Sequence, residues 1–148
     1  MLSNLTAQPQ DKILALVGAY RADPRQDKID LGVGVYKDST GSTPIMRAVK
    51  SAEKLLWQVQ ETKSYVGLAG DPAFSAAMYE LVLDGAVAAD RLSAVATPGG
   101  TGAVRQALEL IKIASPTARV WLPNPTWPNH PSIINYLGMP LAEYRYFN

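Results

Sequence analysis

Hydrophobic residues near the start of the chain recur every three or four positions, the spacing of one face of a helix. They are Ile13, Leu14, Leu16, Val17 and Tyr20. Asp11 precedes them as a candidate N-cap, and Pro24 follows as a residue that cannot continue a helix. The pattern therefore predicts a helix between these two residues, after an extended arm over residues 1–10.

Two further helices are predicted in the first half of the chain. The apolar stripe of the first comprises Ile45, Val49, Ala52, Leu56 and Val59. Thr43 as N-cap and Pro44 in the first turn would begin this helix, which is expected to run to about Gln60. After a loop, Asp71 as N-cap and Pro72 in the first turn would begin the second helix in the same way. Gly85 marks its end.

Strands are predicted where apolar residues alternate or cluster in short runs. Residues 29–35 alternate and lead into a turn at Asp38-Ser-Thr-Gly41. Beyond residue 92 a rhythm of strand, loop and helix repeats. Its predicted segments are a strand at 93–97, a glycine-rich turn, a helix to about 114, a strand at 120–122, a helix at about 132–137 capped by Gly138, and a strand at 141–146.

This alternation predicts an α/β fold with a mostly parallel sheet, right-handed crossovers and flanking helices. Ligands of such sheets bind outside the carboxyl ends of the strands. Because three strands leave edges and helix faces uncovered, the sheet is expected to be incomplete and the chain to be the N-terminal part of a longer polypeptide.

Composition narrows the classes of function. The chain of 148 residues has a formal net charge of +1, with basic residues spread along it, which argues against nucleic-acid or membrane-surface partners. It has no cysteine, so it offers neither a disulfide framework nor a thiolate metal site, and with one histidine no structural zinc site is expected. No stretch resembles a signal peptide or a membrane span, and a cytoplasmic protein is expected.

The segment Thr97-Pro-Gly-Gly-Thr-Gly-Ala-Val-Arg105 carries the strongest chemical signal. A glycine-rich turn that opens a helix lets the backbone approach an anion, and the first N–H groups of the helix point towards it. The next strand ends in Asn124-Pro-Thr-Trp-Pro-Asn-His130, which supplies an aromatic ring. Together the two segments predict a phosphorylated, flat cofactor.

Different roles for these two segments stay open. A dinucleotide fingerprint is disfavoured, because Arg105 stands where its third glycine belongs and no acidic residue follows at the expected distance. A Walker A loop is excluded, because no Gly-Lys-Ser/Thr follows. The turn could also be purely structural. Taken singly, Trp127 is a common packing residue, His130 a structural histidine, Tyr65 a loop tyrosine and Gly34 a bulge in a strand.

Four motifs occur together in a recognisable order: Asp30-Leu-Gly-Val-Gly-Val-Tyr-Lys-Asp38, Tyr65-Val-Gly-Leu-Ala-Gly70, Thr97-Pro-Gly-Gly-Thr-Gly-Ala103 and Asn124-Pro-Thr-Trp-Pro-Asn-His130. In these motifs the chain resembles class I (fold-type I) pyridoxal-phosphate aminotransferases of the aspartate and aromatic amino-acid type. It resembles the bacterial aromatic enzymes most closely through two other segments, Asp11-Lys-Ile-Leu-Ala-Leu16 and Thr43-Pro-Ile-Met-Arg-Ala-Val49. The resemblance covers essentially the whole chain. It implies a homodimer with pyridoxal 5′-phosphate as cofactor.

The resemblance also implies roles for individual residues. Gly99, Gly100 and Thr101 match the turn that binds the cofactor phosphate. Trp127 matches the tryptophan that stacks on the pyridine ring and helps to hold the substrate carboxylate. His130 matches a histidine that supports the aspartate on the pyridine nitrogen.

Two further positions match family residues outside these segments. Gly34 matches a glycine whose backbone contacts the substrate. Tyr65 matches a tyrosine that reaches the phosphate of the neighbouring subunit. The implied organisation is an arm and the first part of a small domain over residues 1–44, and the beginning of the large cofactor-binding domain over residues 45–148.

The family's remaining catalytic groups are not found in this sequence. None of the seven lysines stands in the motif of the lysine that forms a Schiff base with the cofactor. The chain alone is therefore expected to be inactive, with no catalytic residue of its own. Two alternatives stay open: a truncated, non-catalytic homologue that binds or interferes with a dimer, and a module for a nucleotide or another phosphate ligand.

Overall fold

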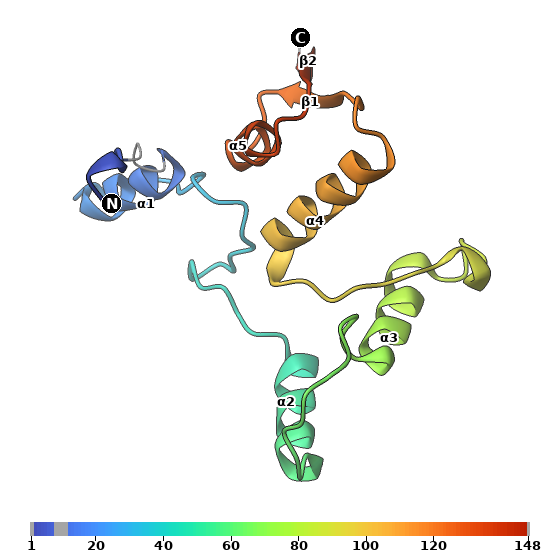
Figure 1. Cartoon of the computed structure of the whole chain (residues 1–148). Coiled ribbons are helices and arrows are strands. Elements are labelled where there is room, and N and C mark those ends of the chain that lie inside the picture. Colours follow the sequence, from blue (N-terminus) through green and yellow to red (C-terminus); the bar gives the residue numbers. More distant parts are fainter. Residues whose placement is uncertain (1, 8–11, 148) are drawn as a thin grey trace. The chain divides into compact units, whose positions relative to one another are not determined.

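The computed structural model describes residues 2–7 and 12–147 (Figure 1). The backbone forms two compact units, Met1–Lys63 and Ser64–Asn148, and each is described by itself. The expected division at residues 44 and 45 stays a prediction. Within the described residues, no helix has the length and apolar character needed to cross a membrane.

The first unit begins with a short 3-10 helix, η1 (Leu2–Asn4), and the helix α1 (Lys12–Ala22). The latter confirms the first predicted helix, although its candidate cap Asp11 lies outside the described residues. The Lys28 ammonium donates hydrogen bonds of 2.6 Å to the carbonyl oxygens of Tyr20 and Asp23. A cation beside the last carbonyl groups of a helix stabilises that end.

The predicted strand over residues 29–35 does not form. Instead the Val35 N–H donates to the Val33 carbonyl oxygen at 2.8 Å, which closes a compact turn. Leu31 is 87% exposed. A strand exists only through hydrogen bonds to a neighbouring strand, and no described residue pairs with this segment. Alternation of apolar residues was therefore not sufficient to predict it.

The turn at residues 38–41 is confirmed. Gly41, at φ 79°, donates its N–H to the carbonyl oxygen of Asp38 at 2.9 Å. The next helix, α2 (Arg47–Val59), begins later than predicted. Thr43 does not cap it, because its hydroxyl donates to the Tyr36 carbonyl oxygen at 3.1 Å. A residue before proline also disfavours helical angles, which moves the start beyond Pro44.

The second unit opens with α3 (Pro72–Leu83), as predicted. The Asp71 carboxylate accepts the Ala73 N–H at 2.7 Å, and Pro72 stands in the first turn. The helix ends at Asp84 in the left-handed conformation, before Gly85. A short 3-10 helix, η2 (Ala89–Arg91), follows.

Residues 93–97, predicted as a strand, have no ladder of hydrogen bonds. Among the described residues, one backbone hydrogen bond joins this segment to an earlier part of the chain: the Ala96 N–H donates to the Ala69 carbonyl oxygen at 2.8 Å. The longest helix, α4 (Gly99–Ala114), then confirms the helix expected after the glycine-rich sequence.

A parallel pair of strands confirms the predicted α/β pattern. β1 (Val120–Asn124) pairs with β2 (Leu141–Arg145), and α5 (Asn129–Tyr136) connects them. The register runs from Val120 opposite Leu141 to Asn124 opposite Arg145. Gly138, at φ 64°, follows α5 and turns the chain towards β2, since only glycine adopts this conformation readily.

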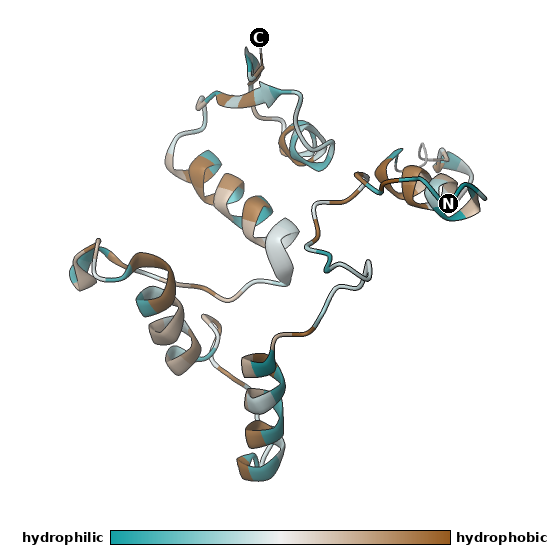
Figure 2. Ribbon diagram, turned by 180° about the vertical axis from the view of Figure 1, so that it is seen from behind, coloured by the Kyte–Doolittle hydropathy of each residue, from teal (hydrophilic) through white to brown (hydrophobic). Residues whose placement is uncertain are grey.

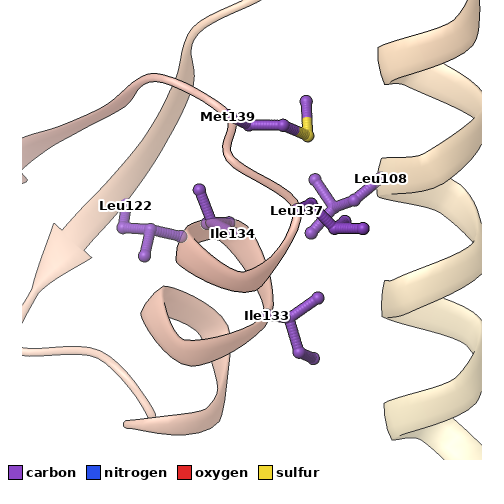
Figure 3. Packing of buried hydrophobic residues seen from close by; sticks show 6 residues of the cluster. All are labelled: Leu108, Leu122, Ile133, Ile134, Leu137 and Met139. Atoms are coloured by element: carbon purple, nitrogen blue, oxygen red, sulfur yellow. The ribbon is translucent and has the colours of Figure 1, made fainter.

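The buried core lies between α4, α5 and the strand pair (Figure 3). Its members are Leu108, Leu122, Ile133, Ile134, Leu137 and Met139. Ile134 is 1% exposed. The Lys112 ammonium donates to the carbonyl oxygen of Leu137 and so joins the end of α4 to the end of α5.

Large hydrophobic side chains are exposed on α1, α2 and α3, and the ribbon of these helices carries hydrophobic residues in Figure 2. Examples are Leu14 on α1, Trp57 on α2 and Phe74 on α3, which are 67%, 81% and 58% exposed. Apolar surface on this scale normally faces a further layer of protein.

Candidate cofactor-binding site

The glycine-rich sequence forms the first turn of α4 and not a loop before it. Gly99, Gly100 and Thr101 are the first three helical residues, and Pro98 at the N-cap supplies no side-chain hydrogen bond. Gly99 has a φ of 71°, which explains why glycine stands there. Its N–H donates to the Thr97 carbonyl oxygen at 2.8 Å, and the Thr97 hydroxyl donates to the Gly99 carbonyl oxygen at 3.1 Å.

The backbone of this turn is open on the side of two glycines. A Cβ atom added at Gly99 or at Gly100 would meet no heavy atom within 4 Å. At Gly102, by contrast, it would lie 2.8 Å from the Pro98 ring, so this glycine serves packing. The N–H groups of the first turn have no partner inside the helix, and they lie at the positive end of its dipole.

The tryptophan segment follows β1 and contains the cis peptide bond Asn124–Pro125. Trp127 lies before α5 and is 42% exposed. The helix begins three residues earlier than predicted, so His130 belongs to α5 and not to the loop. The ring centroids of Trp127 and His130 are 5.3 Å apart with the planes at 88°, an edge-to-face contact.

Two hydrogen bonds also fix His130, one through its backbone and one through its ring. Its backbone N–H donates to the Trp127 carbonyl oxygen at 3.0 Å. Its Nδ1 lies 2.9 Å from the Thr126 hydroxyl oxygen. The imidazole therefore orients the tryptophan ring, while its Nδ1 is engaged within its own segment.

One hydrogen bond joins the two predicted segments. The Asn129 side-chain amide donates to the Thr101 hydroxyl oxygen at 3.3 Å, between the first turns of α5 and α4. The structure thus brings Thr101 and the Trp127 segment together, as the sequence predicted. Sequence reasoning assigned no role to Asn129 or to Thr126. Their only signal was a place within the same motif as Trp127 and His130.

Of the two remaining predicted site residues, only Tyr65 belongs to the unit that carries this site. Gly34 belongs to the first unit, where a Cβ atom would meet nothing within 4 Å. Tyr65 is fully exposed, and the described part of the chain gives its hydroxyl no partner. The roles assigned to these two residues stay predictions, as do those of the turn and of Trp127 and His130.

Arg105 explains why the dinucleotide fingerprint is incomplete. Its guanidinium donates to the Glu109 carboxylate at 2.9 and 3.1 Å, and it lies 4.8 Å from the centroid of the Tyr136 ring. The Glu109 hydrogen bond raises the pKa of Arg105 above its usual value. The arginine therefore joins α4 to α5 through side-chain contacts, at the position where the fingerprint needs a glycine.

The donor set fits a phosphorylated ring. Backbone N–H groups, an accessible glycine surface and the Thr101 hydroxyl suit a phosphate group. The half-exposed indole of Trp127 suits a flat aromatic ring. Pyridoxal 5′-phosphate combines both features, and the residues present are compatible with it.

The sequence model of the family "Aminotransferase class I and II" matches residues 26–148. The chain belongs to this family, and its α/β fold is that of the aspartate and aromatic aminotransferases. This confirms the resemblance on which the residue roles depend.

Similar proteins are aromatic-amino-acid and aspartate aminotransferases. The chain is 57% identical over 148 residues to the aromatic-amino-acid aminotransferase of Paracoccus denitrificans and 44% identical over 151 residues to the aspartate aminotransferase of Escherichia coli. Both alignments include the whole chain, which spans 38% of the length of each relative. The exposed apolar faces agree with this partial coverage.

Solved structures agree. An aromatic amino acid aminotransferase with 3-indolebutyric acid superposes with a TM-score of 0.91 at 57% identity, and covers the whole chain with 38% of its own. The aromatic-amino-acid aminotransferase of Burkholderia pseudomallei, covalently bound to pyridoxal phosphate, has a TM-score of 0.88 at 32% identity, with the same coverage.

Proposed function

We propose that the complete protein is a pyridoxal-phosphate-dependent aminotransferase. It transfers the amino group of an aromatic or acidic amino acid to a 2-oxo acid such as 2-oxoglutarate. Tyrosine, phenylalanine and aspartate are the expected donors. A cytoplasmic location and a homodimer belong to the same proposal.

The observation that carries this proposal is the hydrogen bond between the first turns of α4 and α5. Asn129 binds Thr101, so the open glycine turn and the Trp127 segment lie together at one end of α4 and α5. A phosphate on the turn and a ring beside the indole are the two parts of one cofactor. Membership of the aminotransferase family supports the same assignment.

In this proposal the two segments bind different parts of the cofactor. The N–H groups of Gly100 and Thr101, with the Thr101 hydroxyl, bind the phosphate. Trp127 covers one face of the cofactor ring. His130 holds the indole in its orientation through an edge-to-face contact, with the two ring centroids 5.3 Å apart. The bound cofactor supplies an electron sink, while the protein binds and orients it.

The test is an amino-transfer assay on the complete protein. Aromatic or acidic amino acids are supplied with 2-oxoglutarate, and formation of glutamate is followed with and without pyridoxal phosphate. The proposal expects transfer that depends on the cofactor. Absence of transfer with every donor from a folded, cofactor-loaded protein would contradict it. The 148-residue chain alone is expected to be inactive, which the same assay examines.

A further inference from the structure

The loop before α3 touches the segment that leads into the phosphate turn. The two are joined by the hydrogen bond of 2.8 Å from the Ala96 N–H to the Ala69 carbonyl oxygen. Gly70 follows Ala69 and closes a tight turn, since its own N–H donates to the Gly67 carbonyl oxygen at 2.9 Å. The contact lies within the second unit.

Gly70 leaves no room for a side chain at this contact. An added Cβ would lie 2.5 Å from the Cβ of Ala96, closer than carbon atoms approach in proteins. The Ala96 Cα and N atoms would both be 3.6 Å away, an ordinary contact. The obstacle is therefore the methyl group of Ala96, and either that residue or the loop must move if Gly70 is enlarged.

A movement of Ala96 would also displace the backbone of the phosphate turn. Thr97 follows it, and Thr97 exchanges two hydrogen bonds with Gly99 at 2.8 and 3.1 Å. Gly99 in turn begins α4. The contact of Gly70 with Ala96, the peptide bond to Thr97 and the backbone hydrogen bond from Gly99 to Thr97 therefore join Gly70 to the start of the helix.

We propose that Gly70, acting through Ala96, is a positioning residue for the phosphate-binding turn. The inference rests on the proposed function, because it is that function which gives the turn its phosphate. Gly70 also ends the segment that begins at Tyr65. The same contact thus fixes the tyrosine loop to the turn, so that these two segments share one support.

The test uses the complete protein and the variant Gly70→Ala. Gly85→Ala is the matched control, because Gly85 also has a positive φ, 75°, but has no heavy atom within 4 Å of an added Cβ. It imposes the same kind of backbone strain without the collision. The double variant Gly70→Ala/Ala96→Gly removes the methyl group that Gly70→Ala meets, and Ala96→Gly alone completes the cycle.

Two measurements are made on each protein. One is the dissociation constant of pyridoxal phosphate, and the other is amide hydrogen exchange of residues 97–102 in the cofactor-free protein. Gly70→Ala is expected to raise the dissociation constant by roughly tenfold, the effect of disturbing one hydrogen bond to a charged group. It should also speed the exchange of the turn. Gly85→Ala should change neither, and the double variant should recover both towards the control.

The inference would be overturned if Gly70→Ala and Gly85→Ala had the same dissociation constant and the same exchange rates. It would also be overturned if the double variant recovered neither the affinity nor the slow exchange. A general loss of stability would affect both glycine variants and would not be relieved by Ala96→Gly. If the wild-type protein binds no pyridoxal phosphate, the proposed function fails. The exchange measurement then still decides whether Gly70 positions the turn.

Discussion

The side-chain amide of Asn129 donates to the hydroxyl oxygen of Thr101 at 3.3 Å. The two residues are 28 positions apart, on the first turns of different helices. This bond orients the Thr101 hydroxyl and ties the Trp127 segment to the glycine turn. The two halves of the candidate site are thereby held as one unit.

Asn129→Ala is expected to weaken binding of pyridoxal phosphate. Loss of one neutral hydrogen bond corresponds to an increase in the dissociation constant of between about twofold and tenfold. Asn135→Ala is the control, because Asn135 is exposed on the same helix. Calorimetric titration of the complete protein measures both, and equal affinities for the two variants would contradict the role of Asn129.

Trp127→Leu is expected to weaken cofactor binding more than Trp127→Phe does. Phenylalanine keeps a ring that can stack on the cofactor and meet His130, whereas leucine keeps only bulk. Edge-to-face pairs contribute about 0.5–1.5 kcal/mol beyond buried area. Trp57→Leu, at an 81% exposed tryptophan of α2, serves as the control. If leucine and phenylalanine at position 127 bind the cofactor equally well, Trp127 is not a stacking residue.

Ile134 is expected to dominate the stability of the second unit, because it is the most deeply buried residue of the core. Ile134→Val should lower the free energy of unfolding by about 0.5–1.5 kcal/mol, and Ile134→Ala by about 2–5 kcal/mol. Denaturant titration of the complete protein measures the series. A loss of less than about 1 kcal/mol for alanine would show that the site relaxes and fills the cavity.

Acid sensitivity of the first unit is expected to depend on Asp30. Its carboxylate accepts hydrogen bonds from the Lys37 ammonium at 2.5 Å and from the Gly32 N–H at 3.0 Å. The Lys37 bond, followed by the Gly32 bond, lowers the pKa of Asp30 in the folded protein. Stability from this group is therefore present above its unfolded pKa of about 3.9 and is lost as the pH falls through the lower folded value.

Asp30→Asn should therefore flatten the decline of stability below about pH 4. Asp27→Asn is the control at an exposed carboxylate of the same unit. Unfolding midpoints measured between neutral and acidic pH compare the two. An acid limb that is as steep in Asp30→Asn as in the wild type would show that other carboxylates are responsible.

Local signals predicted the helices better than the strands. Asp71 and Pro72 fix the start of α3 through bonds within a few residues, and Gly138 ends α5 in the same local way. The segment at residues 29–35 depends on a partner strand that alternation alone cannot supply. Thr43 was misplaced as a cap because its hydroxyl binds the Tyr36 carbonyl oxygen instead.

In the candidate site, too, residues within local motifs could be named from the sequence, whereas contacts between distant residues could not. The glycine turn and Trp127 stand in motifs that carry their own chemistry, so the sequence alone could name them as candidates. The bond between Asn129 and Thr101 and the contact between Gly70 and Ala96 join residues 28 and 26 positions apart. Only the packed backbone brings such pairs together, and neither pair has a sequence pattern of its own.

The first turn of α4 is proposed to hold the phosphate of the cofactor. Parallel calorimetric titrations of the complete, cofactor-free protein with pyridoxal 5′-phosphate and with pyridoxal test it most directly, because the two ligands differ only in that group. We predict that removing the phosphate weakens binding by about a hundredfold or more, since several charge-assisted hydrogen bonds are lost. Equal affinity for the two ligands would contradict the account.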